Sequence, residues 1–280
     1  MQLAHTIAEL KAALSQADAD GKRVGFVATM GALHAGHLSL VKKAQEQELF
    51  VVVSVFVNPR QFGQDDDLSN YPRTLGVDAR VLTDSGVDVL FAPSSGEVYP
   101  TSGVVEISAG DLGNKFEGAS RPGHFDGMLT VVNRLFNLVQ PDVAFFGSKD
   151  AQQLVLVSQM VKRQVASGDR EPIKIVACDT VRDPQGLALS SRNQRIDKAD
   201  FAAAISINRA LFAGSKQKTK QAAIEAAKAE LDPKCRLDYI ELINPDTFEV
   251  VDSCEGARMV IAAWVGEVRL IDNLLLGGNS

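Results

Sequence analysis

The sequence predicts an α/β protein, in which a doubly wound parallel sheet precedes a smaller α+β domain at the C-terminal end. Apolar runs of strand length alternate with helical patterns through the first two thirds of the 280 residues, as right-handed β–α–β crossovers require. A composition that is 45% hydrophobic suffices for a large core and two domains. From Asp197 the sequence becomes alanine-rich and helical. We expect the domains to be residues 1–180 and 181–280, with the boundary near Thr180.

Strand and helix signals place the elements of the first domain. Residues 23–29 are a short apolar strand, and residues 36–44 continue as a helix with one apolar side. Residues 49–57 suit a strand buried on both faces and are too short to span a bilayer. Pro72 is expected at the first position of a helix over 72–85, where its missing N–H is harmless. The other expected elements are helices at 5–14, 128–139 and 151–162 and strands at 88–92, 104–108, 143–146 and 173–178.

The second domain is expected to contain two helices and three strands. The helices are at 201–212 and 219–231, and the strands are at 237–243, 258–265 and 268–271. In doubly wound folds, ligands bind beyond the carboxyl ends of the parallel strands. The residues that follow each strand of the first domain are therefore the first candidates for chemistry.

Charge and cysteine usage exclude several classes of protein. A formal net charge of −6 argues against general nucleic-acid affinity, so anions must be recognised by local Lys, Arg and His side chains. The N-terminal helix pattern is not a signal peptide, and no apolar run predicts a membrane partner. Three cysteines without C-x-x-C spacing fit a reducing compartment. We expect a cytoplasmic protein.

Two histidines, His34 and His37, follow the first long strand at the start of a predicted helix. They would share one helical face, beside the unpaired N–H groups and positive dipole end where phosphates bind. Gly36 between them lets a flat or anionic ligand approach the backbone closely. Two alternatives stay open: His34 caps the helix while His37 is solvated, or the pair binds zinc. A third zinc ligand is hard to find, because the remaining histidines are His5 and His124.

Polar residues also follow two other predicted strands. Gln61 comes after the strand at 49–57 and can offer both donors and acceptors. After the strand at 143–146, Lys149 suits a phosphate, and Asp150 suits ribose hydroxyls or a metal-bound phosphate. Ser148 and Asp150 equally fit simple helix capping, which is compatible with ligand binding. Gln153 follows in the first turn of the next helix.

A loop beyond the sheet adds a second set of phosphate partners. Residues 190–193, Ser-Ser-Arg-Asn, combine two hydroxyls with a guanidinium, and these groups bind phosphate oxygens well. Taken alone, the same four residues also fit an ordinary solvated turn before a helix.

Five motifs together resemble the pantoate–β-alanine ligases, also called pantothenate synthetases. In chain order they are Thr29-Met30-Gly31-Ala32-Leu33-His34-Ala35-Gly36-His37, Val57-Asn58-Pro59-Arg60-Gln61-Phe62, Arg121-Pro122-Gly123-His124-Phe125, Phe146-Gly147-Ser148-Lys149-Asp150-Ala151-Gln152-Gln153 and Ser190-Ser191-Arg192-Asn193. The resemblance covers nearly the whole chain and implies a Rossmann-like, nucleotidyltransferase-like fold. The chain departs from the family pattern at Ala28, often proline, at Ser148, often glutamate, and at Gln185, often aspartate. None of these departures removes a side chain that the chemistry needs.

The resemblance implies a two-step reaction. Pantoate first attacks the α-phosphate of ATP to form pantoyl adenylate and pyrophosphate, and β-alanine then displaces AMP to give pantothenate. Both nucleophiles belong to substrates, so the protein must position reactants and neutralise developing charge. The resemblance also implies Mg²⁺ on the phosphates, which needs few protein ligands, and a homodimer. Residues 1–180 would bind ATP and pantoate, and residues 181–280 would form a C-terminal lid.

The resemblance assigns a role to each motif. His37 would be the catalytic proton donor, Gln61 and Gln153 would bind pantoate, and Gln61 would also border β-alanine. The residues implied to bind ATP are Met30, Gly31, Ala32, Leu33, His34, Ala35, Gly36 and His37, then Gly147, Ser148, Lys149 and Asp150, then Val181, and finally Leu189, Ser190, Ser191 and Arg192.

Two other classes of function share some of these features. A nucleotidyltransferase would have the histidine pair and the Ser/Arg loop but would stop at a nucleotidylated product. Two glutamines facing a small carboxylate favour the ligase over this class. A nucleotide sensor without activity would not need Lys149 and Arg192 both directed at phosphates.

Overall fold

Two compact units make up the chain. The computed structural model describes residues 1–62, 68–69 and 71–277. The first unit comprises Met1–Gly147 and Leu156–Cys178, and the second comprises Ser148–Val155 and the chain from Asp179 onward. In the described part of the chain, no helix is both long and apolar enough to cross a membrane.

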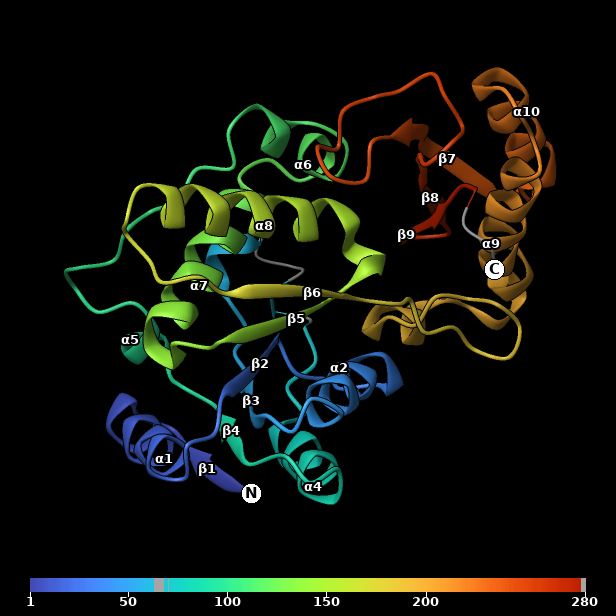
Figure 1. Cartoon of the computed structure of the whole chain (residues 1–280). Coiled ribbons are helices and arrows are strands. Elements are labelled where there is room, and N and C mark those ends of the chain that lie inside the picture. The colour runs from blue at the N-terminus through green and yellow to red at the C-terminus, as the bar shows by residue number, and fades with distance from the viewer. Residues whose placement is uncertain (63–67, 70, 278–280) are drawn as a thin grey trace. The chain divides into compact units, whose positions relative to one another are not determined.

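The first unit contains a six-stranded parallel sheet, as the alternating pattern predicts (Figure 1). Its strand order is β1-β4-β3-β2-β5-β6, so the order reverses between β2 and β5. A crevice at such a reversal is where doubly wound folds bind ligands. The strands are β1 (Gln2–Ala4), β2 (Val24–Thr29), β3 (Phe50–Val55), β4 (Val89–Phe91), β5 (Val143–Gly147) and β6 (Lys174–Cys178).

Helices cover both faces of this sheet, because its central strands are apolar on both sides. Val27, Val53 and Phe145 are packed in one cluster with residues of α2 (Ala35–Gln45) and α4 (Leu75–Asp84). On the other face, the rings of Phe26 and Phe146 both meet Phe136 edge-on, at 6.2 and 6.3 Å between centroids. The other helices of this part of the chain are α1 (Ile7–Ala19), α5 (Ser95–Val98), α6 (Glu117–Ser120), α7 (His124–Val139) and α8 (Ala151–Ala166).

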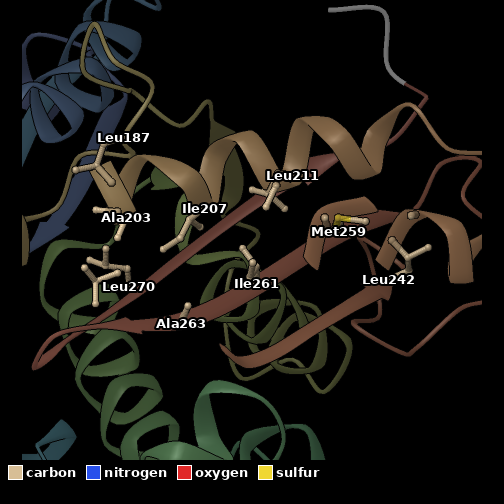
Figure 2. Close-up of a cluster of buried hydrophobic side chains, with 14 of the residues drawn as sticks. Leu187, Ala203, Ile207, Leu211, Leu242, Met259, Ile261, Ala263 and Leu270 are labelled. Atoms are coloured by element: carbon tan, nitrogen blue, oxygen red, sulfur yellow. The ribbon is translucent and has the colours of Figure 1, made fainter. Parts of the chain in front are cut away.

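The second unit contains helices and a small sheet, in the α+β arrangement that the sequence predicts for the C-terminal part of the chain. Its sheet is antiparallel, in the order β7-β8-β9. Figure 2 shows how α9 lies over this sheet, with Ile207 and Leu211 directed at the strand residues Met259 and Ile261. Gly214 of α9 leaves room for Met259, whose Cε would lie 2.6 Å from a Cβ at that position. The elements are α9 (Phe201–Ser215), α10 (Lys220–Glu230), β7 (Cys235–Ile243), β8 (Arg258–Val265) and β9 (Val268–Leu275).

The structure corrects two expected elements. No strand forms at 104–108: the backbone N–H groups of Ile107 and Ala109 donate instead to side chains of α7, Thr130 Oγ1 at 3.0 Å and Asp126 Oδ1 at 2.7 Å. Pro72 does not begin a helix. Helix α4 begins at Leu75 instead, because Thr74 supplies the first helical carbonyl, which accepts from the backbone N–H of Asp78.

The structure also adds one strand and moves several boundaries, among them the end of α1 at Ala19, the end of β9 at Leu275 and the start of α7. The three-residue strand β1 pairs in parallel with β4 at the sheet edge and is too short to show a pattern in the sequence. Helix α7 begins at His124, four residues before the predicted start, because Gly123 adopts a φ of 75° at its N-cap. A left-handed backbone of this kind favours glycine.

Candidate active site

The loop after β2 is a tight turn held by its own side chains. Thr29 Oγ1 donates to the Ser54 carbonyl at 2.7 Å and accepts from the backbone N–H of Gly31 at 3.2 Å. Gly31 and Ala32 then turn the chain with φ values of 85° and 52°. The turn directs the chain from the sheet into α2, so that His34 becomes the N-cap residue of that helix.

The two histidines cap α2 reciprocally. His34 Nδ1 accepts from the backbone N–H of Gly36 at 3.1 Å, and His37 Nδ1 accepts from the backbone N–H of His34 at 3.3 Å. Their ring centroids are 4.1 Å apart. A nitrogen that accepts cannot carry the proton, so each neutral imidazole carries it on Nε2. In this tautomer the proton-bearing atom of each ring is Nε2, and both rings lie at the helix N-terminus, where the dipole favours an anion. Capping and phosphate binding, separate alternatives in the sequence, are compatible here.

The loop after β3 fixes the orientation of the Gln61 amide. Asn58 is 1% exposed; its Oδ1 accepts from Arg60 N–H at 3.2 Å, and its Nδ2 donates to the Gly127 carbonyl at 3.1 Å. With the Asn58 amide held by two backbone groups, its Nδ2 also donates to Gln61 Oε1 at 3.0 Å. Gln61 must then present its Nε2 donors on the other side, where Met30 Sδ lies 3.0 Å away. Gln61 is thus a donor toward any ligand, and its contact with Met30 joins the loops of two neighbouring strands.

Tyr99 completes this network. Its hydroxyl donates to Asn58 Oδ1 at 2.7 Å, and the Arg60 guanidinium lies 4.3 Å from the centre of its ring. Burial raises the pKa of Tyr99 to about 12, although the positive charge of Arg60 acts in the opposite direction. The phenol is therefore a stable donor at neutral pH.

The start of α7 is hydrogen-bonded to the backbone of the Gln61 loop. Arg121 can only donate, so His124 Nε2 accepts from its Nη1 at 3.3 Å, and His124 Nδ1–H donates to the Gln61 carbonyl at 2.8 Å. Gly127 lets the helix approach the same loop, because a Cβ there would lie 2.1 Å from the Arg60 carbonyl oxygen. Two motifs far apart in the sequence therefore form one support.

In the second unit, the segment 181–189 folds back on itself. Leu189 N–H donates to the Val181 carbonyl at 2.9 Å, which brings together two residues implied to bind ATP. Asp183 Oδ1 accepts from the backbone N–H groups of Gln185 and Leu187, both at 2.9 Å. Position 185 contributes its backbone N–H to this turn, so glutamine in place of aspartate leaves this contact intact.

Two residues of β9 connect this segment to the predicted phosphate loop. Arg182 donates to both carboxylate oxygens of Asp272, at 2.6 and 2.9 Å, and Asp272 is 5% exposed. The next residue, Asn273, donates through Nδ2 to the carbonyls of Ser148 and Lys149, both at 2.9 Å. The backbone of 148–149 and the segment 181–189 are thereby fixed to the same strand. Position 148 also contributes its backbone, so serine in place of glutamate leaves this contact intact.

Of the two charged residues in the predicted phosphate loop, Asp150 is exposed and Lys149 is mostly buried. Lys149 Nζ lies 3.6 Å from Asp150 Oδ1, and their side chains are 18% and 51% exposed. Gln153 is half-buried in the first turn of α8. Ser190 caps the next turn, with its Oγ accepting from Arg192 N–H at 3.3 Å. Across the described residues, no group of three or more His, Cys, Asp or Glu side chains is arranged to hold a metal ion.

In each unit, some supporting residues carry no signal in the sequence. Tyr99 of the first unit, and Arg182, Asp272 and Asn273 of the second, act through long-range hydrogen bonds that no local pattern encodes. Asn58 differs from these residues, because it belongs to a family motif and follows a strand end.

A strand-order reversal with polar loops beyond β2, β3 and β5 defines an α/β protein of the Rossmann-like class. A family model described as pantoate-beta-alanine ligase matches residues 2–275. The chain belongs to the pantoate–β-alanine ligase family, and it is a ligase.

Several relatives support this assignment. The chain is 47% identical to the pantothenate synthetase of Thermobifida fusca, with 91% of this chain and 90% of the relative covered. It is 44% identical to that of Bacteroides thetaiotaomicron, with 98% of both covered. The crystal structure of pantothenate synthetase from Thermus thermophilus superposes with a TM-score of 0.90 at 44% identity, covering 98% of this chain and 99% of that one. The ligase from Francisella tularensis, complexed with beta-gamma ATP and beta-alanine, gives 0.79 at 37%, covering 98% and 97%.

Proposed function

We propose that the chain condenses pantoate with β-alanine at the expense of ATP, through a pantoyl-adenylate intermediate, releasing AMP and pyrophosphate. The observation that carries this proposal is the contact between Met30 and Gln61. This contact joins the loop that carries the imidazoles of His34 and His37 to the loop that carries the amide donors of Gln61. One set suits phosphate and the other suits a carboxylate, which are the two reacting groups of an acid adenylation.

In the first step, a carboxylate oxygen of pantoate attacks the α-phosphorus, and the bond from that phosphorus to the bridging oxygen breaks. Charge accumulates on the departing pyrophosphate. His37 is assigned to this charge, because its Nδ1 is engaged by the backbone and its Nε2–H is the donor. His34 provides a second Nε2–H, and the turn 30–36 carries both rings. Donors aimed at developing charge are typically the largest single contribution to such a reaction.

Gln61 and Gln153 are assigned to pantoate. Gln61 presents N–H donors, so it suits the carboxylate or the hydroxyl oxygens of pantoate. For β-alanine, the same donors suit its carboxylate and not its ammonium group. In the second step, the free amine attacks the acyl carbon and AMP leaves, so pyrophosphate and its donors take no part.

The remaining ATP-binding roles fall to Gly147 and to residues of the second unit. Lys149 is assigned to phosphate, Val181 to adenine, and Leu189 to Arg192 to the phosphates. Mg²⁺ supplies charge neutralisation when bound to the phosphates. The exposed carboxylate of Asp150 fits a hard, oxygen-preferring ion and would be the residue that holds it or the ribose. The separate roles of residues 1–180 and 181–280 stay a prediction.

ATP–pyrophosphate exchange tests the proposal. Exchange that depends on pantoate supports the ligase. Exchange without pantoate would indicate a nucleotidyltransferase, and ATP binding without exchange would indicate a sensor. The cysteine spacing and the net charge further predict a cytoplasmic protein without nucleic-acid partners. The family resemblance predicts a homodimer, and light scattering of the purified protein measures its oligomeric state.

A further inference from the structure

One carboxylate lies beneath the histidine loop and is not used by the reaction as proposed. Asp78, on α4, is 2% exposed. Its Oδ1 accepts from the backbone N–H of Leu33 at 2.9 Å, and its Oδ2 accepts from the backbone N–H of Ala32 at 3.1 Å. The Thr74 hydroxyl also donates to Oδ2, at 3.0 Å. A buried carboxylate with three donors is well satisfied in this position.

These contacts change what the loop can offer to ATP. Consecutive backbone N–H groups in a tight turn commonly form a nest that binds a phosphate oxygen. Here the N–H groups of Ala32 and Leu33 are directed at Asp78, so the protein's own anion occupies the nest. Phosphate recognition from this loop is therefore left to the two imidazoles that follow it. His34 is the next residue after Leu33, so the position of the histidine cap depends on where Asp78 holds the turn.

The packing around the turn 31–33 is tight, so the position of the His34 cap follows the position of Asp78. A Cβ added at Gly31 would lie 3.0 Å from Asp78 Oδ2 and 3.0 Å from Val55 Cγ1. Ala32 holds a φ of 52°, which an alanine adopts only when its surroundings impose it. The carboxylate supplies that constraint by binding the N–H groups on both sides of the Ala32 Cα.

We infer that Asp78 is a positioning residue for adenylation: it holds the turn 31–33 so that the Nε2–H donors of His34 and His37 face the departing pyrophosphate. This inference rests on the proposed function. Asp78 itself touches no substrate in this scheme and acts through the histidines alone.

The variant Asp78→Asn tests the inference, because its amide keeps the size but can accept from only one of the two loop N–H groups. We expect pantoate-dependent pyrophosphate exchange to slow by about 10-fold to 10²-fold, the effect of misplacing a catalytic group by about 1 Å. The second step, measured with preformed pantoyl adenylate and β-alanine, should stay near normal. Asp84→Asn is the matched control: it removes the same charge from an exposed position of the same helix.

A double variant separates positioning from a general structural effect. If Asp78 acts through the histidines, Asp78→Asn should add little slowing in a His37→Ala background. Slowing by the same factor in both backgrounds, or equal slowing of both reaction steps, would overturn the inference. Hydrogen exchange at the amides of 32 and 33 should accelerate in Asp78→Asn and not in Asp84→Asn. Accelerated exchange with unchanged adenylation would also overturn it.

A milder variant covers the case in which Asp78→Asn does not fold. Thr74→Val removes only the hydroxyl that holds Oδ2, and we expect about threefold slower adenylation with partial loss of amide protection at 32 and 33. Unchanged values of both would overturn the inference. If the wild-type protein shows no pantoate-dependent exchange, the proposed function fails first, before any variant is compared.

Discussion

At the scale of single residues, the tautomer of His37 gives its two ring nitrogens different roles. Nδ1 accepts from the backbone of His34, and Nε2–H is assigned to the leaving pyrophosphate. We expect His37→Ala to slow pyrophosphate release by about 10²–10³-fold, the usual scale for one such donor. His37→Asn should slow it equally, because its amide oxygen can replace Nδ1 but nothing replaces Nε2–H. Rapid-quench measurements give the rate of each step separately. If amine attack slows as much as pyrophosphate release, His37 shapes the whole site and does not serve the leaving group alone.

The donor polarity of Gln61 gives a second prediction. In Gln61→Glu, Asn58 Nδ2 still has its acceptor, but a carboxylate oxygen replaces the Nε2 donors. We expect the KM for pantoate to rise by about 10–10²-fold, because losing a hydrogen bond to a charged group costs about 1.5–3 kcal/mol. Steady-state kinetics with ATP at saturation measure this change. Gln47→Glu makes the same charge change at an exposed position and should have no effect; an equal rise in the KM for ATP would contradict the assignment.

Tyr99 predicts a dependence of stability on alkaline pH. An unfolded tyrosine ionises near pH 10, whereas burial raises the pKa of Tyr99 to about 12. Between these values the folded protein keeps a proton that the unfolded chain has lost. The stabilisation is therefore complete below about pH 10 and is lost as pH rises toward 12. Denaturant unfolding at pH 8 and pH 11 should show a smaller loss of stability for Tyr99→Phe than for the wild type.

At the scale of elements, the contact between Arg182 and β9 fixes the turn 181–189. Asp272 is almost completely buried, so Asp272→Ala leaves the Arg182 guanidinium without its carboxylate. We expect a loss of about 3 kcal/mol in the free energy of unfolding, at the low end for breaking a buried pair because Arg182 is 20% exposed. Glu230→Ala breaks the exposed pair with Arg209 and should cost about 0–1 kcal/mol. Similar losses in both variants would contradict this account.

The elements that the sequence predicts correctly are those whose own residues determine them. The central strands β2, β3 and β5 are apolar runs that fit the interior of a sheet covered on both faces. Helix α9 follows an uninterrupted alanine-rich pattern. The segment 104–108 has a strand-like composition, but two side chains of α7 accept from the backbone N–H groups of Ile107 and of Ala109, just after the segment. That outcome depends on residues about 20 positions away. The start of α4 likewise depends on Thr74 rather than on the more conspicuous proline.

The same distinction holds for the candidate site. The histidine loop, Gln61 and the loop 147–150 lie after strands β2, β3 and β5, as the parallel arrangement predicts. The polarity of Gln61 could not be predicted, because it depends on Gly127, 66 positions further along the chain, through Asn58. The role of Asp78 could not be predicted for the same reason. Its carboxylate accepts from the backbone N–H of Leu33, which lies 45 residues away in the sequence.

At the scale of the whole molecule, each unit has its own core. Leu82 is fully buried in the first unit and Leu211 in the second. Each change to alanine should cost about 2–5 kcal/mol. We expect native-state hydrogen exchange to show the larger loss of protection within the unit that carries the substitution. Equal losses throughout the chain in both variants would show that the two units unfold as one.

The hydrogen bonds that orient Asn58 have a consequence for how this enzyme can change over evolutionary time. Two of the groups that hold the Asn58 amide, the Arg60 N–H and the Gly127 carbonyl, belong to the backbone, and the Tyr99 hydroxyl, which also contacts it, can either donate or accept. Point mutation replaces side chains but leaves backbone donors and acceptors in place. A substitution elsewhere therefore does not readily turn the Gln61 amide so that its oxygen faces the ligand. That orientation is the one that an acid substrate with a cationic group at this position would require. We therefore expect new acyl specificities to arise through substitutions at Gln153, with the donor polarity of Gln61 retained.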